Sequence, residues 1–138
     1  MEIMIASEFI YDNIIIDLEL THPIYLGAGV NINTSYMHVM DVGNVANPAY
    51  IRDTYTIKFY GYFERGSYDD GLKDFYKIKD GLLGHPNIVD EDGNIWCRFL
   101  QMQGPTFLGN DDMGRSIFTM EFEITVDGNN STYRKTIQ

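Results

Sequence analysis

The sequence has a single cysteine, few basic residues and no long apolar run. One cysteine, Cys97, excludes an internal disulfide and is typical of reducing compartments. It lies in an apolar run, so we interpret it as a small buried hydrophobe rather than a nucleophile. No stretch reaches the ~18–20 apolar residues that span a bilayer, and the first residues lack the basic start of a signal peptide. We therefore expect a protein that is made and used in a cytoplasm, without membrane contact.

Acidic residues outnumber basic ones by 20 to 10, which gives a formal net charge of −10. Nucleic-acid binders carry clustered Lys and Arg on one face, and the sequence has no such cluster. An acidic protein can still lie beside DNA if its role is to avoid binding it, because like charges repel.

Metal and catalytic signatures are also scarce. The histidines His22, His38 and His85 are not spaced as metal ligands, so we expect structural or surface roles for them. No Gly-x-Ser-x-Gly elbow occurs. Residues 90–94 mimic part of a calcium loop, but the glycine comes fourth and no glutamate stands at the twelfth position, so a hairpin turn is the better interpretation. We expect no metal, no cofactor and no enzymatic activity.

Hydrophobic patterning predicts one domain over residues 1–138, with a mobile end at 127–138. The 10 Tyr and 8 Phe favour sheet. The expected fold class is α+β: a mixed or antiparallel sheet of four to five strands, with two helices packed on one face. We expect strands at 24–26, 36–42, 55–62, 95–102 and 118–126, helices at 5–18 and from Ser67 to about Leu82, and loops at 28–35 and 43–53.

The two expected helices differ in the strength of their signals. Residues 14–20 also alternate with the period of a strand, so a strand competes with the second half of the first helix. The second helix has Ser67 as a plausible N-cap, with Asp69 and Asp70 at the positive end of its dipole. Gly71 inside it is a mild cost.

The clearest strand lies near the end of the sequence, where apolar and polar residues alternate from Phe118 to Val126. Before it, Gly109–Gly114 reads as a tight polar turn. The upstream run 95–102 is followed by Gly104-Pro105, which we expect to end that strand. The predicted arrangement is a hairpin with a long connection.

Residues 105–126 resemble the C-terminal signature of a bacteriophage family, the small minor capsid or tail-terminator (tail-completion) proteins of long-tailed phages. That signature reads roughly Pro-x-x-Leu-Gly-Arg-Asp-x-x-Gly-Arg, followed by an aromatic strand ending near Asn-Phe. Asn110 stands where arginine is usual, and Glu121 where asparagine is usual. The matching residues are Pro105, Leu108, Gly109, Asp111, Gly114, Arg115 and Phe122.

The resemblance covers most of the chain, residues 24–126, and implies much the same architecture. It also implies an N-terminal helix that leads into a short strand, and the helix expected at 5–18 rests partly on it. In function it implies a structural virion protein at the head–tail junction, assembled in the host cytoplasm. It would form a ring of six copies that ends the tail tube and joins the tail to the head connector, with DNA passing through the lumen without specific binding. Asp111, Asp112, Gly114 and Arg115 are the candidate subunit-interface residues. Two interpretations stay open for them: the aspartates cap the turn and pair with Arg115, or the turn contacts the next subunit through arginine–carboxylate pairs.

Two alternatives accompany this interpretation. A head-completion or stopper protein of the connector is a close relative in role. A metal-dependent hydrolase is a different class, and it would use Asp90, Asp92, Asp111 and Asp112, because clustered carboxylates can hold Mg²⁺.

Overall fold

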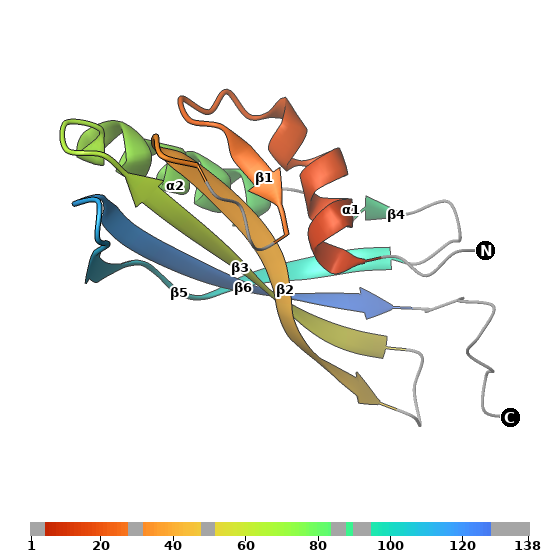
Figure 1. Ribbon diagram of the computed structural model, residues 1–138. Coiled ribbons are helices and arrows are strands. Elements are labelled where there is room, and N and C mark those ends of the chain that lie inside the picture. The colour runs from red at the N-terminus through yellow and green to blue at the C-terminus, as the bar shows by residue number, and fades with distance from the viewer. Residues whose placement is uncertain (1–4, 28–31, 48–51, 84–87, 90–94, 128–138) are drawn as a thin grey trace, which may run out of the picture.

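The computed structural model describes residues 5–27, 32–47, 52–83, 88–89 and 95–127. A twisted six-stranded sheet carries both helices on one face (Figure 1). The strand order is β1-β2-β3-β6-β5-β4; β1 and β2 are parallel, and the other neighbours are antiparallel. The predicted α+β fold is confirmed. The elements are α1 (Ala6–Asn13), a 3₁₀ turn (Ile15–Asp17), β1 (Ile24–Leu26), β2 (Tyr36–Asn47), β3 (Arg52–Phe63), α2 (Tyr68–Leu83), β4 (Ile88–Val89), β5 (Ile95–Asn110) and β6 (Ser116–Asp127).

The core lies between the helices and the sheet. The alternation predicted for β6 holds, because Phe118 and Ile124 mark the ends of a buried row on its inner face. The same face of β2 and β3 supplies further buried side chains, and each helix adds an apolar stripe. The principal contributors are Met37, Val39, Ile57 and Phe59 from the sheet, Phe9 and Ile10 from α1, and Phe75, Ile78 and Leu82 from α2.

The β2–β3 hairpin is much longer than predicted. The expected loop over residues 43–53 is wrong at both ends, because Gly43–Asn47 extend β2 and Arg52 and Asp53 begin β3. A register shift between Asp41 and Gly43 admits the glycine without ending the ladder. Cross-strand pairing therefore overrides the loop-like Gly, Asn and Ala composition. The far end of this hairpin extends beyond the helical layer (Figure 1).

The β5–β6 hairpin also corrects the prediction. Gly104-Pro105 does not end the first strand: β5 continues through it to Asn110, and the connection to β6 is short rather than long. The register shifts between Gln103 and Thr106, so Pro105 lies in an irregular part of the ladder, where its missing N–H is tolerated. Cys97 lies within β5 as expected, in register with Thr125.

The N-terminal helix is shorter than the predicted 5–18. It ends at Asn13, where Ile14 leaves helical geometry with φ −124° and ψ −56°, and a single 3₁₀ turn follows. The competing strand over 14–20 does not form. The second helix matches its prediction, and the Gly71 N–H donates to the Ser67 carbonyl. The expected turn at 90–94, His85 and the expected mobile end after Asp127 lie outside the described residues.

A buried carboxylate fastens the entry to β1 onto α2. Asp74 is fully buried and accepts three hydrogen bonds, from the backbone N–H groups of Thr21 (2.8 Å) and His22 (2.9 Å) and from His22 Nδ1 (2.9 Å). Lys77 Nζ donates to the Glu19 carbonyl nearby (2.7 Å). These contacts satisfy polar groups that would otherwise be left without partners beside the core.

Close approach between α2 and the sheet depends on two glycines. A Cβ on Gly71 would lie 2.4 Å from the Phe63 ring, and one on Gly61 would lie 2.6 Å from the same ring and from Phe75. Phe63 is fully buried, so its ring fills the space that both missing side chains leave. Glycine at both positions follows from packing rather than from backbone conformation.

Candidate interaction surface at the β5–β6 hairpin

The turn between β5 and β6 is built around Asp111. One of its carboxylate oxygens accepts from the backbone N–H groups of Met113 (3.0 Å) and Arg115 (2.9 Å), and the other accepts from Arg115 Nε (2.7 Å). The backbone closes the turn as well, since the Asp111 N–H donates to the Arg115 carbonyl (2.9 Å). Gly114 has φ +78°, a conformation that favours glycine. The turn is therefore fixed from both its side chains and its backbone.

Arg115 links this turn to the segment before β2. Its Nη1 donates to the carbonyls of Ile32 (2.6 Å) and Thr34 (3.1 Å), and its guanidinium lies 5.5 Å and 5.4 Å from the ring centroids of Tyr36 and Tyr62. The residue is buried. The interpretation in which Arg115 pairs within its own subunit describes this geometry, and its Nε and Nη1 donors are engaged inside the fold.

The ion pair shifts the acidity of Asp111. Desolvation would raise the pKa of this carboxyl, but the hydrogen bonds from Arg115 and Met113 and the charge of Arg115 outweigh it, so the pKa is lowered. Asp111 therefore stays ionised to lower pH than a free aspartate. Asp112, the next residue, is exposed.

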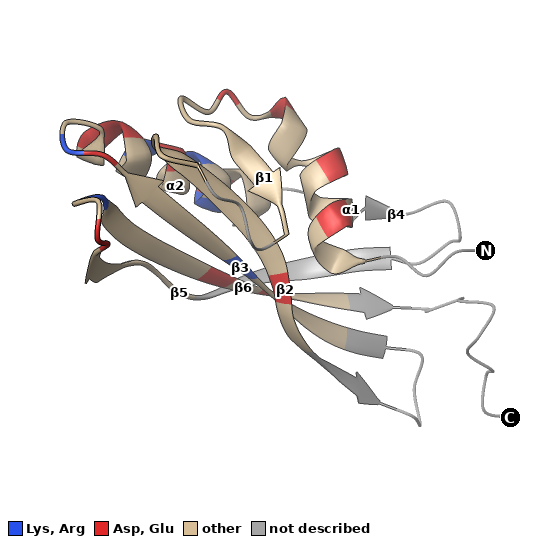
Figure 2. Ribbon diagram, in the orientation of Figure 1, with Lys and Arg blue, Asp and Glu red and all other residues tan. Residues whose placement is uncertain are grey.

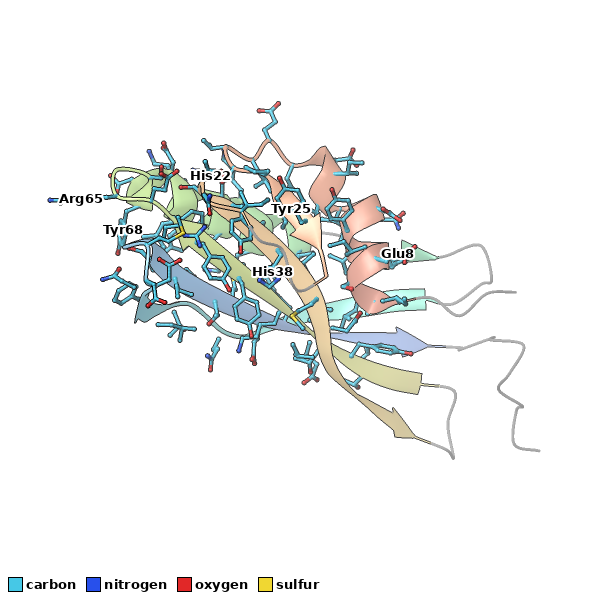
Figure 3. The ribbon with its side chains drawn as sticks, viewed as in Figure 1. Glu8, His22, Tyr25, His38, Arg65 and Tyr68 are labelled. Atoms are coloured by element: carbon cyan, nitrogen blue, oxygen red, sulfur yellow. The ribbon has the colours of Figure 1, made fainter. Side chains whose placement is uncertain are left out.

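A stack of aromatic rings lies beside Arg115 on β2 and β3. The rings of Tyr36 and Tyr62 are stacked at 4.9 Å, and those of His38 and Tyr60 at 4.8 Å. His38, labelled in Figure 3, is buried, and among the described residues its Nδ1 is the one buried side-chain nitrogen or oxygen without a hydrogen-bond partner. Burial lowers the pKa of His38, with partial opposition from a hydrogen bond to the Gly27 backbone, so the neutral form of the ring is favoured.

Four apolar side chains around this hairpin remain open to solvent. Tyr68, Phe107, Leu108 and Met113 are 47%, 53%, 57% and 55% exposed, and we call them the hairpin-end patch. The ring centroids of Tyr68 and Phe107 lie 5.3 Å and 5.4 Å from the ring centroid of the buried Phe118, so the patch adjoins the core. The hairpin and the start of α2 lie at the same end of the molecule (Figure 1).

A β-bulge explains why two consecutive residues of β5 are both exposed. Phe107 is in register with Phe118 and Gly109 with Ile117, so Leu108 is the extra residue of the bulge. Gly109 has φ +121°, which suits it to follow this irregularity. Bulges of this kind re-aim side chains, and here the bulge places Leu108 at the surface.

Only two of the four hydrolase candidates, Asp111 and Asp112, lie within the described residues. Among the described residues, no group of three or more His, Cys, Asp or Glu side chains could hold a metal ion. Asp111 is committed to Arg115, and Asp90 and Asp92 lie outside the described residues. In the same part of the chain, no helix combines the length and the apolar character needed to cross a membrane.

The comparisons with known proteins identify no family. No protein-family model matches the chain, and no curated protein matches it. The resemblance over residues 105–126 therefore rests on the motif residues themselves.

Sequence reasoning brought Asp111 and Arg115 together but missed two features of this surface. The contacts from Arg115 to Ile32 and Thr34 span 83 and 81 residues, and no local pattern encodes them. The hairpin-end patch has a fainter signal, since adjacent Phe107 and Leu108 break the alternation of a half-buried strand.

Proposed function

We propose that this protein is a structural component of a bacteriophage virion that forms a ring of six copies. The ring ends the tail tube and joins the tail to the head connector, and no catalytic chemistry is assigned to the chain. The proposal draws on the resemblance over residues 105–126 and on the way those residues are used. Asp111, Gly114 and Arg115 fix the hairpin turn, and Gly109 follows the bulge that exposes Leu108.

The observation that carries the proposal is a rigid turn that presents exposed apolar side chains. Asp111 and Arg115 hold the backbone, while Leu108 and Met113 are more than half exposed beside them. A pre-organised apolar surface loses little conformational entropy on binding and is typical of protein–protein contacts. A protein that joins the tail tube to the head connector needs such a surface for its partners.

The charge distribution supports the DNA-facing part of the role. Residues 1–51 contain no Lys or Arg. Acidic residues mark α1 and the connection into β1, whereas residues of both signs mark α2 (Figure 2). A ring with a predominantly acidic lumen would let DNA pass without retaining it, because like charges repel.

A head-completion or stopper protein is the alternative role within the same class. It would use the same kind of surface but would meet the connector rather than the tail tube. Mixing the purified protein with each partner separately distinguishes the two roles, since a terminator associates with tube ends and a stopper with connectors.

The test is negative-stain microscopy of the purified protein, alone and mixed with tail tubes of its own phage, with sedimentation velocity for the mass. We expect closed rings, or a cap of density on one end of each tube. Particles that stay monomeric and never cap a tube would contradict the proposal. Retention of double-stranded DNA at low salt, measured by fluorescence anisotropy, would contradict the non-binding lumen.

A further inference from the structure

Three exposed aspartates are sequence neighbours of residues in the hairpin-end patch. Asp69 and Asp70 directly follow Tyr68 at the start of α2, and Asp112 directly precedes Met113; all three aspartates are exposed. Two exposed cations are also near in the sequence: Lys73 follows on α2, and Arg65 precedes Tyr68 and extends away from the body at the same end as Tyr68 (Figure 3). Beside its apolar side chains the patch therefore has three exposed carboxylates against two exposed cations, a net negative rim.

The aspartates at the start of α2 also have a local role, since they complement the positive end of the helix dipole. That role does not extend to Asp112, which lies on the separate β5–β6 turn. The Asp111 side chain accepts the turn's hydrogen bonds, from Met113 and Arg115. The negative rim is thus assembled from two elements that are distant in the sequence.

A second copy of this chain is a poor electrostatic complement to that rim. The chain carries a net charge of −10, so two copies repel each other unless cations lie opposite the carboxylates. Several cations are already engaged within the fold. Lys58 pairs with Glu121 (3.4 Å), Lys77 donates to the Glu19 carbonyl (2.7 Å), Lys79 lies over the Tyr76 ring (5.6 Å), and Arg115 pairs with Asp111 (2.7 Å).

We infer that the hairpin-end patch docks a different protein, whose contact surface has an apolar centre and a rim of Lys and Arg. The inference rests on the proposed function. In that ring, this end of each subunit contacts a protein other than a second copy of the chain. The apolar side chains supply affinity, and the carboxylates select a basic partner and speed its approach. Contacts between ring subunits then use other faces, so this inference replaces the interpretation in which Asp112 and its turn contact the next subunit.

The test needs variants that change the patch without unfolding the chain. Leu108→Ser combined with Met113→Ser removes two side chains that are more than half exposed, so the core is untouched. Asp69→Asn combined with Asp112→Asn reduces the rim charge while keeping similar size. Ile16→Ser is the matched control, because Ile16 is 63% exposed but lies in the 3₁₀ turn after α1. Far-UV circular dichroism verifies that each variant is folded.

The first probe is an amphipathic helical peptide of leucine and lysine, compared with the same peptide carrying glutamate in place of lysine. We expect the lysine peptide to bind at least about tenfold more tightly than the glutamate peptide, with affinity that falls as salt rises. The Leu108/Met113 variant should lose about tenfold or more in affinity, and the Asp69/Asp112 variant should lose most of the salt dependence. Equal binding of both peptides, or unchanged binding to the Leu108/Met113 variant, would overturn the inference.

The second probe separates this inference from the proposed function. Sedimentation velocity and tube-capping are measured for wild type and for the Leu108/Met113 variant. Rings that persist in the variant while capping is lost support a non-identical partner at the patch. Loss of rings in the variant would show that a second copy occupies the patch and would overturn the inference. Wild-type protein that neither forms rings nor caps tubes contradicts the proposed function, while the peptide comparison decides the patch independently.

Discussion

Replacing Gly71 with alanine should destabilise the protein, although the same change in an isolated helix would be stabilising. Alanine gains up to about 1 kcal/mol over glycine in a helix interior. Here the new methyl group would lie 2.4–2.6 Å from three atoms of the Phe63 ring. The ring cannot simply retreat, because it also packs closely over Gly61 and against Phe75. Overpacking of this kind costs about 1–3 kcal/mol, and after the helix-propensity gain we expect a net loss of up to about 2 kcal/mol.

Gly81→Ala in the same helix is the control. Its methyl group would meet the Leu18 side chain at 3.0 Å and 3.4 Å, and Leu18 is only partly buried and ends in flexible methyl groups. We expect this variant to range from neutral to about 1 kcal/mol more stable. Urea unfolding followed by far-UV circular dichroism compares the two at equal m-values.

Substitution of Phe63 provides a second test of the clash between its ring and the new methyl group. Phe63→Leu should cost less in the Gly71→Ala background than in wild type, because the smaller side chain relieves the clash; a double-mutant cycle measures this coupling. The reasoning would be refuted if Gly71→Ala were as stable as Gly81→Ala, or if the two substitutions were additive.

Three further predictions follow from the described contacts. Asp74→Ala should lower the free energy of unfolding by about 3–5 kcal/mol, because it leaves two backbone N–H groups and an imidazole without their acceptor, whereas His22→Ala should cost about 1–2 kcal/mol; equal losses in urea unfolding would contradict this order. Arg115→Lys should cost about 1–3 kcal/mol, since one ammonium cannot reach Asp111, Ile32 and Thr34 together; a variant with wild-type stability would show that the link is dispensable. The folded-state pKa of His38 lies below its ordinary value of 6.5, so the unfolded chain binds the proton more readily than the folded chain. The stability that the neutral His38 ring contributes is complete above pH 6.5 and is lost as pH falls from there through the lowered folded-state pKa. His38→Phe should flatten that part of the pH dependence, and an unchanged profile would assign it to other groups.

The sequence predicted those features that depend on local periodicity. The alternation from Phe118 to Ile124 identified both β6 and its buried face, because a strand encodes its two faces residue by residue. The apolar stripe and flanking signals of α2 placed that helix within a residue of its observed start. Asp111 and Arg115 could also be paired, since they are four residues apart on either side of a glycine.

The remaining features depend on contacts between distant segments. Residues 43–47 look like a loop by composition, yet they pair with β3, whose ladder outweighs local preference. Gly71 appeared to be only a cost to the helix, because nothing local reveals that Phe63 fills the space above it. Asp74 appears in the sequence as one more charged helical residue, and only the packed structure shows it accepting bonds from Thr21 and His22.

The central place of β6 constrains how the chain can fold during synthesis. β3 ends at Phe63, but its second partner, β6, begins at Ser116, about 50 residues later. At roughly 5–20 residues per second, translation leaves that edge of β3 unpaired for roughly 3–10 s. Because β5 also pairs with β6, neither half of the sheet is complete until the last strand arrives. The β2–β3 hairpin therefore emerges with one edge of β3 unpaired, and an unpaired strand edge can pair with other chains.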